Sequence, residues 1–126
     1  MGNLRTGNAL IVESYCPDRG DVVWVSFSPQ SGHEQAGDRP ALVLSPKDYN
    51  QKTGLAFFCP ITSQVKGYSF EVVIPAGYKV SGSILSDHMK SLDWKTRRAR
   101  HYCELPDSVI SDVTRQIGAL IGIHGR

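Results

Sequence analysis

The sequence predicts a mainly β protein, a small barrel-like sheet of short strands with one amphipathic helix packed on it. Short apolar segments rich in β-branched and aromatic residues alternate with glycine- and proline-containing turns through most of the chain. Near the C-terminus the apolar spacing changes to that of a helix. The chain has 126 residues, 40% of them hydrophobic and 21% charged, which is typical of one globular domain.

The strands are expected in chain order at residues 22–27, 41–45, 55–59, 70–74 and 83–87. The run at 41–45 is continuously apolar, which predicts a central strand buried on both faces. Residues 46–54 are expected to form a loop, because Asn50 to Gly54 are turn-forming residues. The segment at 83–87 is the last strand that the pattern predicts.

A helix is predicted from about Pro106 to Gly122. Its apolar residues recur at helical spacing and are Val109, Ile110, Val113, Ile117, Leu120 and Ile121. Pro106 suits the first turn, Asp107 offsets the helix dipole there, and Gly122 suits the stop. We expect residues 1–14 to be a flexible extension or an added leader, 15–122 to be the single domain, and 123–126 to be a tail.

Several function classes are disfavoured by composition. No apolar stretch approaches the ~20 residues of a membrane span, and the N-terminus lacks a signal-peptide pattern, so we expect a cytoplasmic protein. Three cysteines, odd in number and widely spaced, argue against a disulfide framework and a zinc site. The four histidines form no helical metal-binding pair. We therefore expect no metal and no cofactor.

A polar loop bracketed by Gly32 and Gly37 leads into Arg39 and Pro40, at the mouth of the predicted strand 41–45. Pro40 restricts the backbone of Arg39 to extended geometry. A guanidinium held rigidly at a strand end is suited to binding a phosphate or a carboxylate. An ordinary hairpin loop with Arg39 in a surface salt bridge explains this stretch equally well.

The net charge of +2 is unevenly distributed. Residues 89–101 contain one acid, Asp93, and five basic residues, which are Lys90, Lys95, Arg97, Arg98 and Arg100. Trp94 lies among them, and basic residues interleaved with an aromatic ring suit a phosphate backbone and an unstacked base. This makes Lys90, Trp94, Lys95 and Arg97 candidates for RNA binding. A solvated basic face is the commoner meaning of such a run.

Further polar residues fall at predicted strand ends: Thr62 and Ser63 after one strand, Asp87 and His88 at another. If these ends converge with Arg39, the pocket holds a fixed cation, hydroxyl donors, a carboxylate and an imidazole. It contains no obvious activated nucleophile. RNA suits such a pocket because its own 2′-hydroxyl is the nucleophile.

In that chemistry Arg39 and the Thr62 hydroxyl would stabilise the charge on the phosphorane. Arg39 is a poor general acid or base, because a guanidinium stays protonated above pH ~12. Glu34 or His33 is the better candidate for proton transfer. Taken singly, His33 and His88 are more simply explained as exposed or hydrogen-bonded histidines.

These residues together resemble the MazF/PemK toxins of type II toxin–antitoxin systems. The likeness covers about residues 15–122. It is carried by Gly20-Asp21-Val22-Val23-Trp24-Val25, Gly32-x-Glu34-Gln35-x-Gly37-x-Arg39-Pro40-Ala41-x-Val43-Leu44, Tyr49-Asn50-x-Lys52-Thr53-Gly54, Pro60-x-Thr62, Lys66-Gly67-Tyr68-x-Phe70-Glu71-Val72-Val73 and Lys90-Ser91-Leu92-Asp93-Trp94. The combined order and spacing are specific, although each piece alone is weak.

The resemblance implies an SH3-like barrel that forms a homodimer and a metal-independent endoribonuclease cutting single-stranded RNA, often mRNA, at a short sequence. The implied products are a 2′,3′-cyclic phosphate and a 5′-hydroxyl, and the implied protein partner is an antitoxin with a flexible, acidic and apolar C-terminal segment. The family's catalytic arginine and threonine fall on Arg39 and Thr62. Its RNA-contacting positions fall on Glu34, Gln35, Ser63, Gln64, Asp87, Lys90 and Arg97.

The chain also departs from the family pattern. His33 and His88 stand where relatives more often have Ser and Gln, and Leu85 stands where PemK-type members carry an arginine. The likeness is therefore closer to MazF than to PemK, and the base preference is open. The alternative to a toxin enzyme is a barrel that binds RNA or an antitoxin without catalysis.

Overall fold

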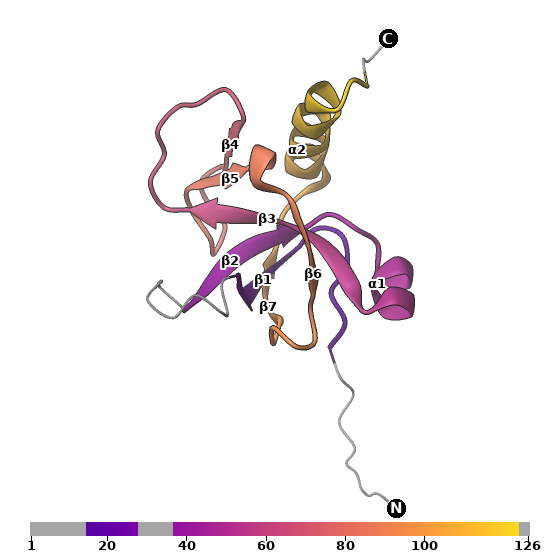
Figure 1. Ribbon diagram of the computed structural model, residues 1–126. Helices are drawn as coiled ribbons and strands as arrows, with labels where there is room; N and C mark the ends of the chain where they lie inside the picture. The colour runs from indigo at the N-terminus through magenta and orange to yellow at the C-terminus, as the bar shows by residue number, and fades with distance from the viewer. Residues whose placement is uncertain (1–14, 28–36, 124–126) are drawn as a thin grey trace, which may run out of the picture.

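Among the described residues, 15–27 and 37–123, the computed structural model contains one seven-stranded antiparallel sheet and two α-helices (Figure 1). The strand order is β4-β5-β3-β2-β1-β7, and β6 also pairs with β3. The strands are β1 (Asp21–Ser26), β2 (Asp38–Val43), β3 (Leu55–Thr62), β4 (Glu71–Val73), β5 (Ser83–Leu85), β6 (Lys90–Asp93) and β7 (Arg100–Glu104). The predicted mainly β fold with a C-terminal helix is confirmed.

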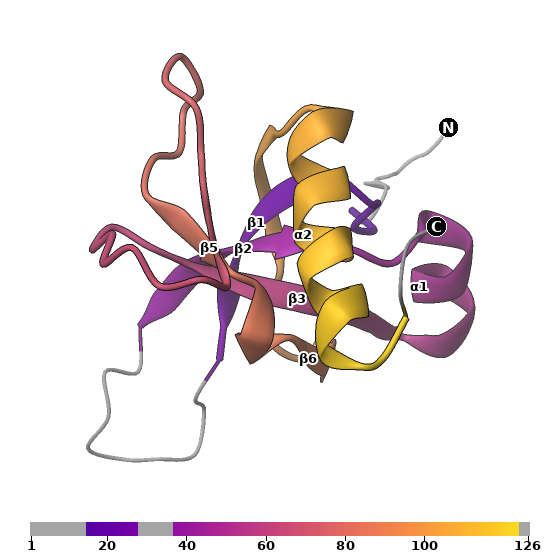
Figure 2. The same cartoon turned by 90° about the horizontal axis from the view of Figure 1, so that it is seen from above.

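The central strands are buried on both faces, because two apolar clusters lie on opposite sides of the sheet. Helix α2 (Asp107–Leu120) covers one face (Figure 2) and contributes Val109, Ile110 and Val113 to a cluster with Val22, Leu42, Cys59 and Ile84. The second cluster contains Val23, Val25, Ala41, Val43, Phe58 and Trp94. This double burial explains the continuously apolar run that predicts a central strand, and Ala41, Leu42 and Val43 are fully buried.

Helix α1 (Lys47–Thr53) replaces the loop predicted at residues 46–54. Gly54 ends the helix in the left-handed conformation at φ 77°, and its N–H donates to the Asn50 carbonyl at 3.0 Å. Asn50 is fully buried, and its amide nitrogen donates to the carbonyls of Pro17 and Ser45. The loop prediction is wrong because Gly54 ends a helix and Asn50 makes buried hydrogen bonds, although both residue types are common in turns.

Strands β6 and β7 lie beyond the last strand that the sequence pattern predicts. β6 pairs with the first half of β3, and β7 pairs with β1. Both are short and largely exposed, so their side chains lack the apolar alternation that reveals a strand. The predicted strand at 83–87 ends instead at Leu85, and a 3₁₀ turn, η1 (Ser86–His88), follows.

The remaining elements differ from expectation mainly at their ends. β2 begins at Asp38, and β3 continues through Pro60 to Thr62. Along one edge, β3 pairs first with β6, as far as Phe58, and then with β5, from Ile61 onward. Pro60 lies between these two pairings, where the missing N–H of a proline is tolerated. Helix α2 lies within the predicted range, with Pro106 as its N-cap. No helix in the described part of the chain is long and apolar enough to cross a membrane.

Candidate functional site

Arg39 and Thr62 lie on neighbouring strands at the same end of the sheet. β2 and β3 are antiparallel, with Ala41 opposite Pro60 and Val43 opposite Phe58. Continuing this register along both strands puts Arg39 opposite Thr62. Opposite residues in an antiparallel pair share one face, so the guanidinium and the hydroxyl project from the same side. The start of β2 and the end of β3 therefore lie at the same end of the sheet.

The Arg39 side chain is held against an aromatic ring. Arg39 is exposed and is paired with Val25 of β1. Its Cζ atom lies 6.0 Å from the centroid of the Phe27 ring, which is a cation–π distance. Phe27 in turn packs edge-to-face on the buried Phe58 ring at 6.5 Å. This chain of contacts ties an exposed cation to the core and limits the positions that it samples.

Thr62 ends β3 with its hydroxyl partly engaged. The N–H of Gln64 donates to Thr62 Oγ1 at 3.1 Å, and within residues 15–27 and 37–123 the hydroxyl proton has no acceptor. On its other side Thr62 is paired with the fully buried Ser83 of β5. Gly82 lies so close that a Cβ there would overlap the Thr62 carbonyl oxygen. The backbone of Thr62 is therefore fixed by tight packing on β5.

A cavity of about 370 Å³ opens beside Thr62. It is lined by Thr62, Gln64, Lys66, Tyr68, Phe70, Glu71, Leu85, Asp87 and His88. Of the candidate site residues, Thr62, Gln64, Asp87 and His88 thus share one hollow, and Ser63 is exposed directly after β3. Aromatic faces beside hydrogen-bonding groups are what an unstacked nucleobase requires.

Five lining residues were not singled out as site residues from the sequence: Lys66, Tyr68, Phe70, Glu71 and Leu85. A signal for them is present, because Lys66 and Tyr68 repeat the basic–aromatic pattern that draws attention to residues 89–101. Glu71 organises this connection, since its Oε1 accepts the N–H groups of Lys66 at 3.1 Å and Gly67 at 3.0 Å. A carboxylate used in this way supports the loop that carries Tyr68.

Asp87 and His88 belong to η1, and His88 Nε2 lies 3.8 Å from Asp87 Oδ1. Beneath them, burial and then the Asp87 charge raise the pKa of the Cys59 thiol to about 12. Cys59 Sγ points at the Ser86 carbonyl at 3.9 Å. A thiol that remains protonated at neutral pH is not an activated nucleophile, so the cavity offers acids, bases and donors but no thiolate.

The basic segment divides into exposed and anchored side chains. Lys90 and Lys95 are exposed, and Lys95 Nζ lies 5.6 Å from the Trp94 ring centroid. The Trp94 prediction is wrong: the residue is 6% exposed within the second apolar cluster, and its Nε1–H donates to the Asn50 carbonyl at 2.9 Å. A ring that is this deeply buried leaves too little surface for a base to stack on. Arg97 is half-buried and donates to backbone carbonyls.

The proton-transfer candidates His33 and Glu34, and the RNA-binding candidate Gln35, lie outside the described residues. The flanking strands do constrain where the chain enters and leaves that segment, because Ser26 of β1 is paired with Asp38 of β2.

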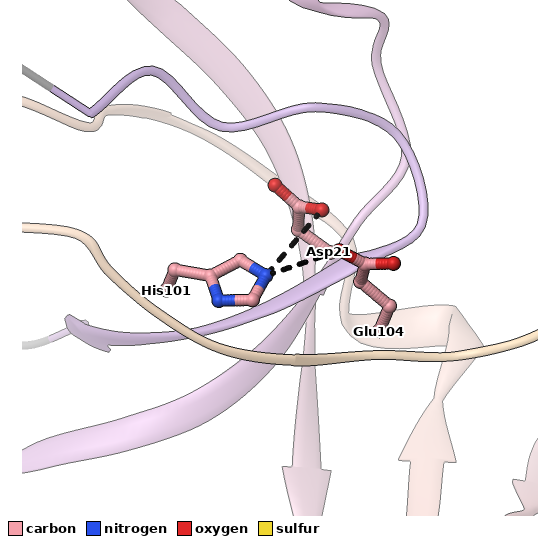
Figure 3. Close-up of side chains that lie close together, drawn as sticks. All are labelled: Asp21, His101 and Glu104. Atoms are coloured by element: carbon pink, nitrogen blue, oxygen red, sulfur yellow. Dashed lines mark ion pairs between the residues drawn. The ribbon is translucent and has the colours of Figure 1, made fainter.

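Among the described residues, one group of three potential metal ligands comes together: Asp21, His101 and Glu104 (Figure 3). His101 Nε2 lies 3.9 Å from Asp21 Oδ1 and 3.5 Å from Glu104 Oε2. The other Asp21 oxygen accepts from the Tyr15 hydroxyl and the Asp18 N–H. The group belongs to the start of β1, the end remote from Arg39, and is explained as an ion-pair cluster outside the candidate site.

The fold and the site define a class of protein. Residues 18–121 match the family described as PemK-like, MazF-like toxin of type II toxin–antitoxin system, and the chain belongs to this family. The match spans the sheet, the candidate site and helix α2.

Individual relatives agree with this assignment. The chain is 45% identical over 112 residues to the endoribonuclease toxin MazF of Escherichia coli strain K12, covering 89% of this chain and all of that one. It is 28% identical to Escherichia coli endoribonuclease PemK, covering 82% and 81% of the two chains. A MazE–MazF crystal structure from Deinococcus radiodurans superposes with a TM-score of 0.83 at 53% identity, covering 88% of this chain and 100% of that chain.

These comparisons confirm the toxin endoribonuclease class that the motifs predict, and the chain is closer to MazF than to PemK.

Proposed function

We propose that this protein is the toxin of a type II toxin–antitoxin system and acts in the cytoplasm by cutting single-stranded RNA, mRNA included, at a short sequence. The observation that carries the proposal is the β2–β3 register, which puts Arg39 and Thr62 at the same end of the sheet, together with the cavity of aromatic and polar side chains that Thr62 lines. Family membership and identity to curated endoribonucleases support the same class of activity.

In the proposed reaction the RNA 2′-oxygen attacks the adjacent phosphorus. The 2′-O–P bond forms, the P–O5′ bond breaks, and the products are a 2′,3′-cyclic phosphate and a 5′-hydroxyl. A base accepts the 2′-hydroxyl proton and an acid protonates the leaving 5′-oxygen, and Glu34 and His33 are the candidates for these roles. No step needs a metal ion, so cleavage is expected to be insensitive to EDTA.

Arg39 and Thr62 supply electrostatic stabilisation in this scheme. A guanidinium presents paired N–H donors that match two non-bridging phosphate oxygens, and it stays charged throughout the reaction. The Thr62 hydroxyl, whose oxygen accepts the Gln64 N–H, adds a neutral donor from the neighbouring strand. Both groups are held by packing before substrate binds, Arg39 on Phe27 and Thr62 on β5.

The cavity and its surroundings are proposed to bind the RNA. Tyr68 and Phe70 offer faces for a splayed base, and Gln64, Asp87 and His88 offer hydrogen bonds to its edge. Ser63 follows Thr62 directly and is exposed, and the exposed Lys90 and Lys95 are proposed to contact RNA phosphates further along the chain. Gln35 is proposed as a further contact by family position.

The test compares variants on a long unstructured RNA, with end-group analysis of the fragments. Arg39→Ala and Thr62→Val are each expected to lower kcat about 10²–10³-fold, the usual cost of one preorganised donor. Arg115→Ala is the matched control, because Arg115 is an exposed arginine on α2 whose partner is Asp112. Wild-type cleavage rates in both site variants would refute the assignment, and RNA binding without cyclic-phosphate ends would favour a non-catalytic barrel.

Two protein partners are proposed. An antitoxin segment rich in acidic and apolar residues would occupy the same surface as RNA, so excess single-stranded RNA should slow its binding. A second copy of the chain would form a homodimer, for which the exposed apolar residues Leu120, Ile121 and Ile123 at the end of α2 offer surface to bury. Sedimentation of the purified protein measures this, and a monomer at micromolar concentration would refute it.

A further inference from the structure

Arg97 is hydrogen-bonded to Ser26, the last residue of β1, and to Phe27, which follows it. Its Nη1 group donates to the Ser26 carbonyl at 3.0 Å and to the Phe27 carbonyl at 3.2 Å. In return the Ser26 N–H donates to the Arg97 carbonyl at 3.3 Å. One residue thus makes three hydrogen bonds to a strand end that is remote from it in the sequence. Hydrogen bonds from a charged donor are about twice as strong as neutral ones.

The turn that carries Arg97 is itself fixed. Asp93 Oδ1 accepts the N–H groups of Lys95 at 3.1 Å and Thr96 at 3.0 Å, and the Arg97 N–H donates to the Asp93 carbonyl at 3.2 Å. Trp94 anchors the start of the turn in the core. Arg98 adopts φ 58°, a conformation uncommon outside glycine that the surrounding bonds must maintain. These bonds fix the backbone of the turn and so restrict the position of the Arg97 side chain.

That position is next to the proposed catalytic arginine. Phe27, whose carbonyl Arg97 binds, carries the ring on which the Arg39 guanidinium rests at 6.0 Å. At the start of β2, Asp38 precedes Arg39 and forms an ion pair with Arg100 of β7, at 2.6 Å between Oδ2 and Nη1. Two arginines of the basic segment thus anchor the β1 and β2 ends on either side of Arg39.

We propose that Arg97 is a positioning residue that fixes Arg39 through the Phe27 backbone and ring, rather than a contact to RNA phosphate. This inference rests on the proposed function, because it assigns Arg97 a role in placing the catalytic guanidinium. It also reinterprets the basic segment, in which Lys90 and Lys95 face solvent whereas Arg97 serves the architecture of the site.

Two variants separate positioning from phosphate binding. Arg97→Met removes charge and hydrogen bonds together. Arg97→Lys keeps the charge but loses the planar head with its fixed N–H directions. Lys95→Met is the matched comparison, since Lys95 is exposed in the same turn and its ammonium lies over the Trp94 ring. Circular dichroism and urea unfolding confirm that each variant is folded before it is assayed.

The first readout needs no RNA. Amide hydrogen exchange is measured by NMR in the free protein at Ser26, Phe27 and Arg39. We expect exchange at these residues to accelerate about tenfold in Arg97→Met, because the strand end loses two charge-assisted bonds, and to stay unchanged in Lys95→Met. Unchanged exchange in Arg97→Met would overturn the anchoring role, whatever the activity of the protein.

The second readout uses RNA with a 2′-deoxynucleotide at the mapped cleavage site, which binds but lacks the attacking hydroxyl. Positioning predicts that Arg97→Met leaves the slope of log Kd against log salt unchanged and lowers kcat about 10- to 100-fold on normal RNA. Lys95→Met should reduce that slope by about 0.7, the value for one phosphate contact on a single strand. Arg97→Lys should resemble Arg97→Met in kcat.

A slope reduced by about 0.7 in Arg97→Met, together with wild-type kcat in Arg97→Lys, would overturn the proposal in favour of a phosphate contact. Failure of the proposed function looks different: the wild-type protein itself would not cut RNA, and the exchange experiment would still decide whether Arg97 holds the end of β1. Should Arg97→Met not fold, Arg97→Lys carries both readouts.

Discussion

Gly82 is the residue through which the packing of Thr62 is most directly tested. Gly82 has φ +111°, and a Cβ built there would overlap the Thr62 carbonyl oxygen and lie 2.9 Å from its carbonyl carbon. The nearby backbone has no flexible end that can move aside, because Thr62 is paired with Ser83 and the Gly82 carbonyl accepts the Ile74 N–H at 2.9 Å. An alanine at this position must separate β5 from β3.

Gly77 provides a matched control. It also has a positive φ, +102°, but nothing lies within 4 Å of a Cβ at this position. Gly77→Ala therefore carries only the cost of the backbone conformation, about 1–2 kcal/mol. Gly82→Ala adds overpacking against backbone, typically about 1–3 kcal/mol more, for a total of about 2–5 kcal/mol. Against a domain stability of about 5–15 kcal/mol, both variants should remain measurable by urea unfolding.

The two variants should also differ in activity. Relief of the clash in Gly82→Ala moves Thr62 relative to Arg39, and a displacement of about 1 Å at a catalytic group can cost about 100-fold in rate. Gly77→Ala should cut RNA at nearly the wild-type rate under conditions where it is folded. Equal destabilisation by the two alanines, or full activity in Gly82→Ala, would show that the contact between Gly82 and Thr62 does not set the site.

Three further predictions follow from burial and pKa shifts. Trp94→Phe should lower the free energy of unfolding by about 2 kcal/mol and leave RNA affinity unchanged, because the ring is core; a tenfold affinity loss without destabilisation would restore the stacking role. Cys59, with its pKa raised to about 12 by burial, should resist iodoacetamide at pH 8 in the folded protein and react once unfolded in urea; equal rates would contradict its burial. Hydrogen bonds from Thr96 lower the pKa of Asp93 from its ordinary 3.8, so its contribution to stability is present above that pH and lost as the pH falls below it. Acid titration of unfolding should therefore be shallower in Asp93→Asn, and identical curves would refute the assignment.

Residue patterns along the chain were sufficient to predict the strands around Val23, Leu42 and Phe58 and the helix around Val113. Each of these elements buries a continuous or periodic set of apolar side chains, and periodicity records burial directly. The sequence also puts Arg39 near the start of one strand and Thr62 at the end of another, but it is the resemblance to MazF/PemK toxins that assigns both residues to one site.

Local patterns were misleading where polar residues are structural. Asn50 reads as a turn former but is the buried centre of a hydrogen-bond network at helix α1. β6 and β7 are short, largely exposed strands with charged side chains. They therefore lack the apolar alternation of a half-buried strand. Lys66 and Tyr68 enter the cavity because Glu71 folds their loop over it, a bond between residues that no periodicity connects.

Sequence by itself determined where the central strands and the C-terminal helix are buried and what class of protein this is. Only the tertiary structure decided what each basic or aromatic side chain does: Trp94 lies in the core, Arg97 bonds to the end of β1, and Lys95 remains in solvent. The physical reason is that residue type fixes the chemistry a side chain can perform, whereas its partner is supplied by strands distant in the chain. Arg97 and Lys95 carry the same charge, but Arg97 donates hydrogen bonds to the carbonyl oxygens of Ser26 and Phe27 and so has a different role.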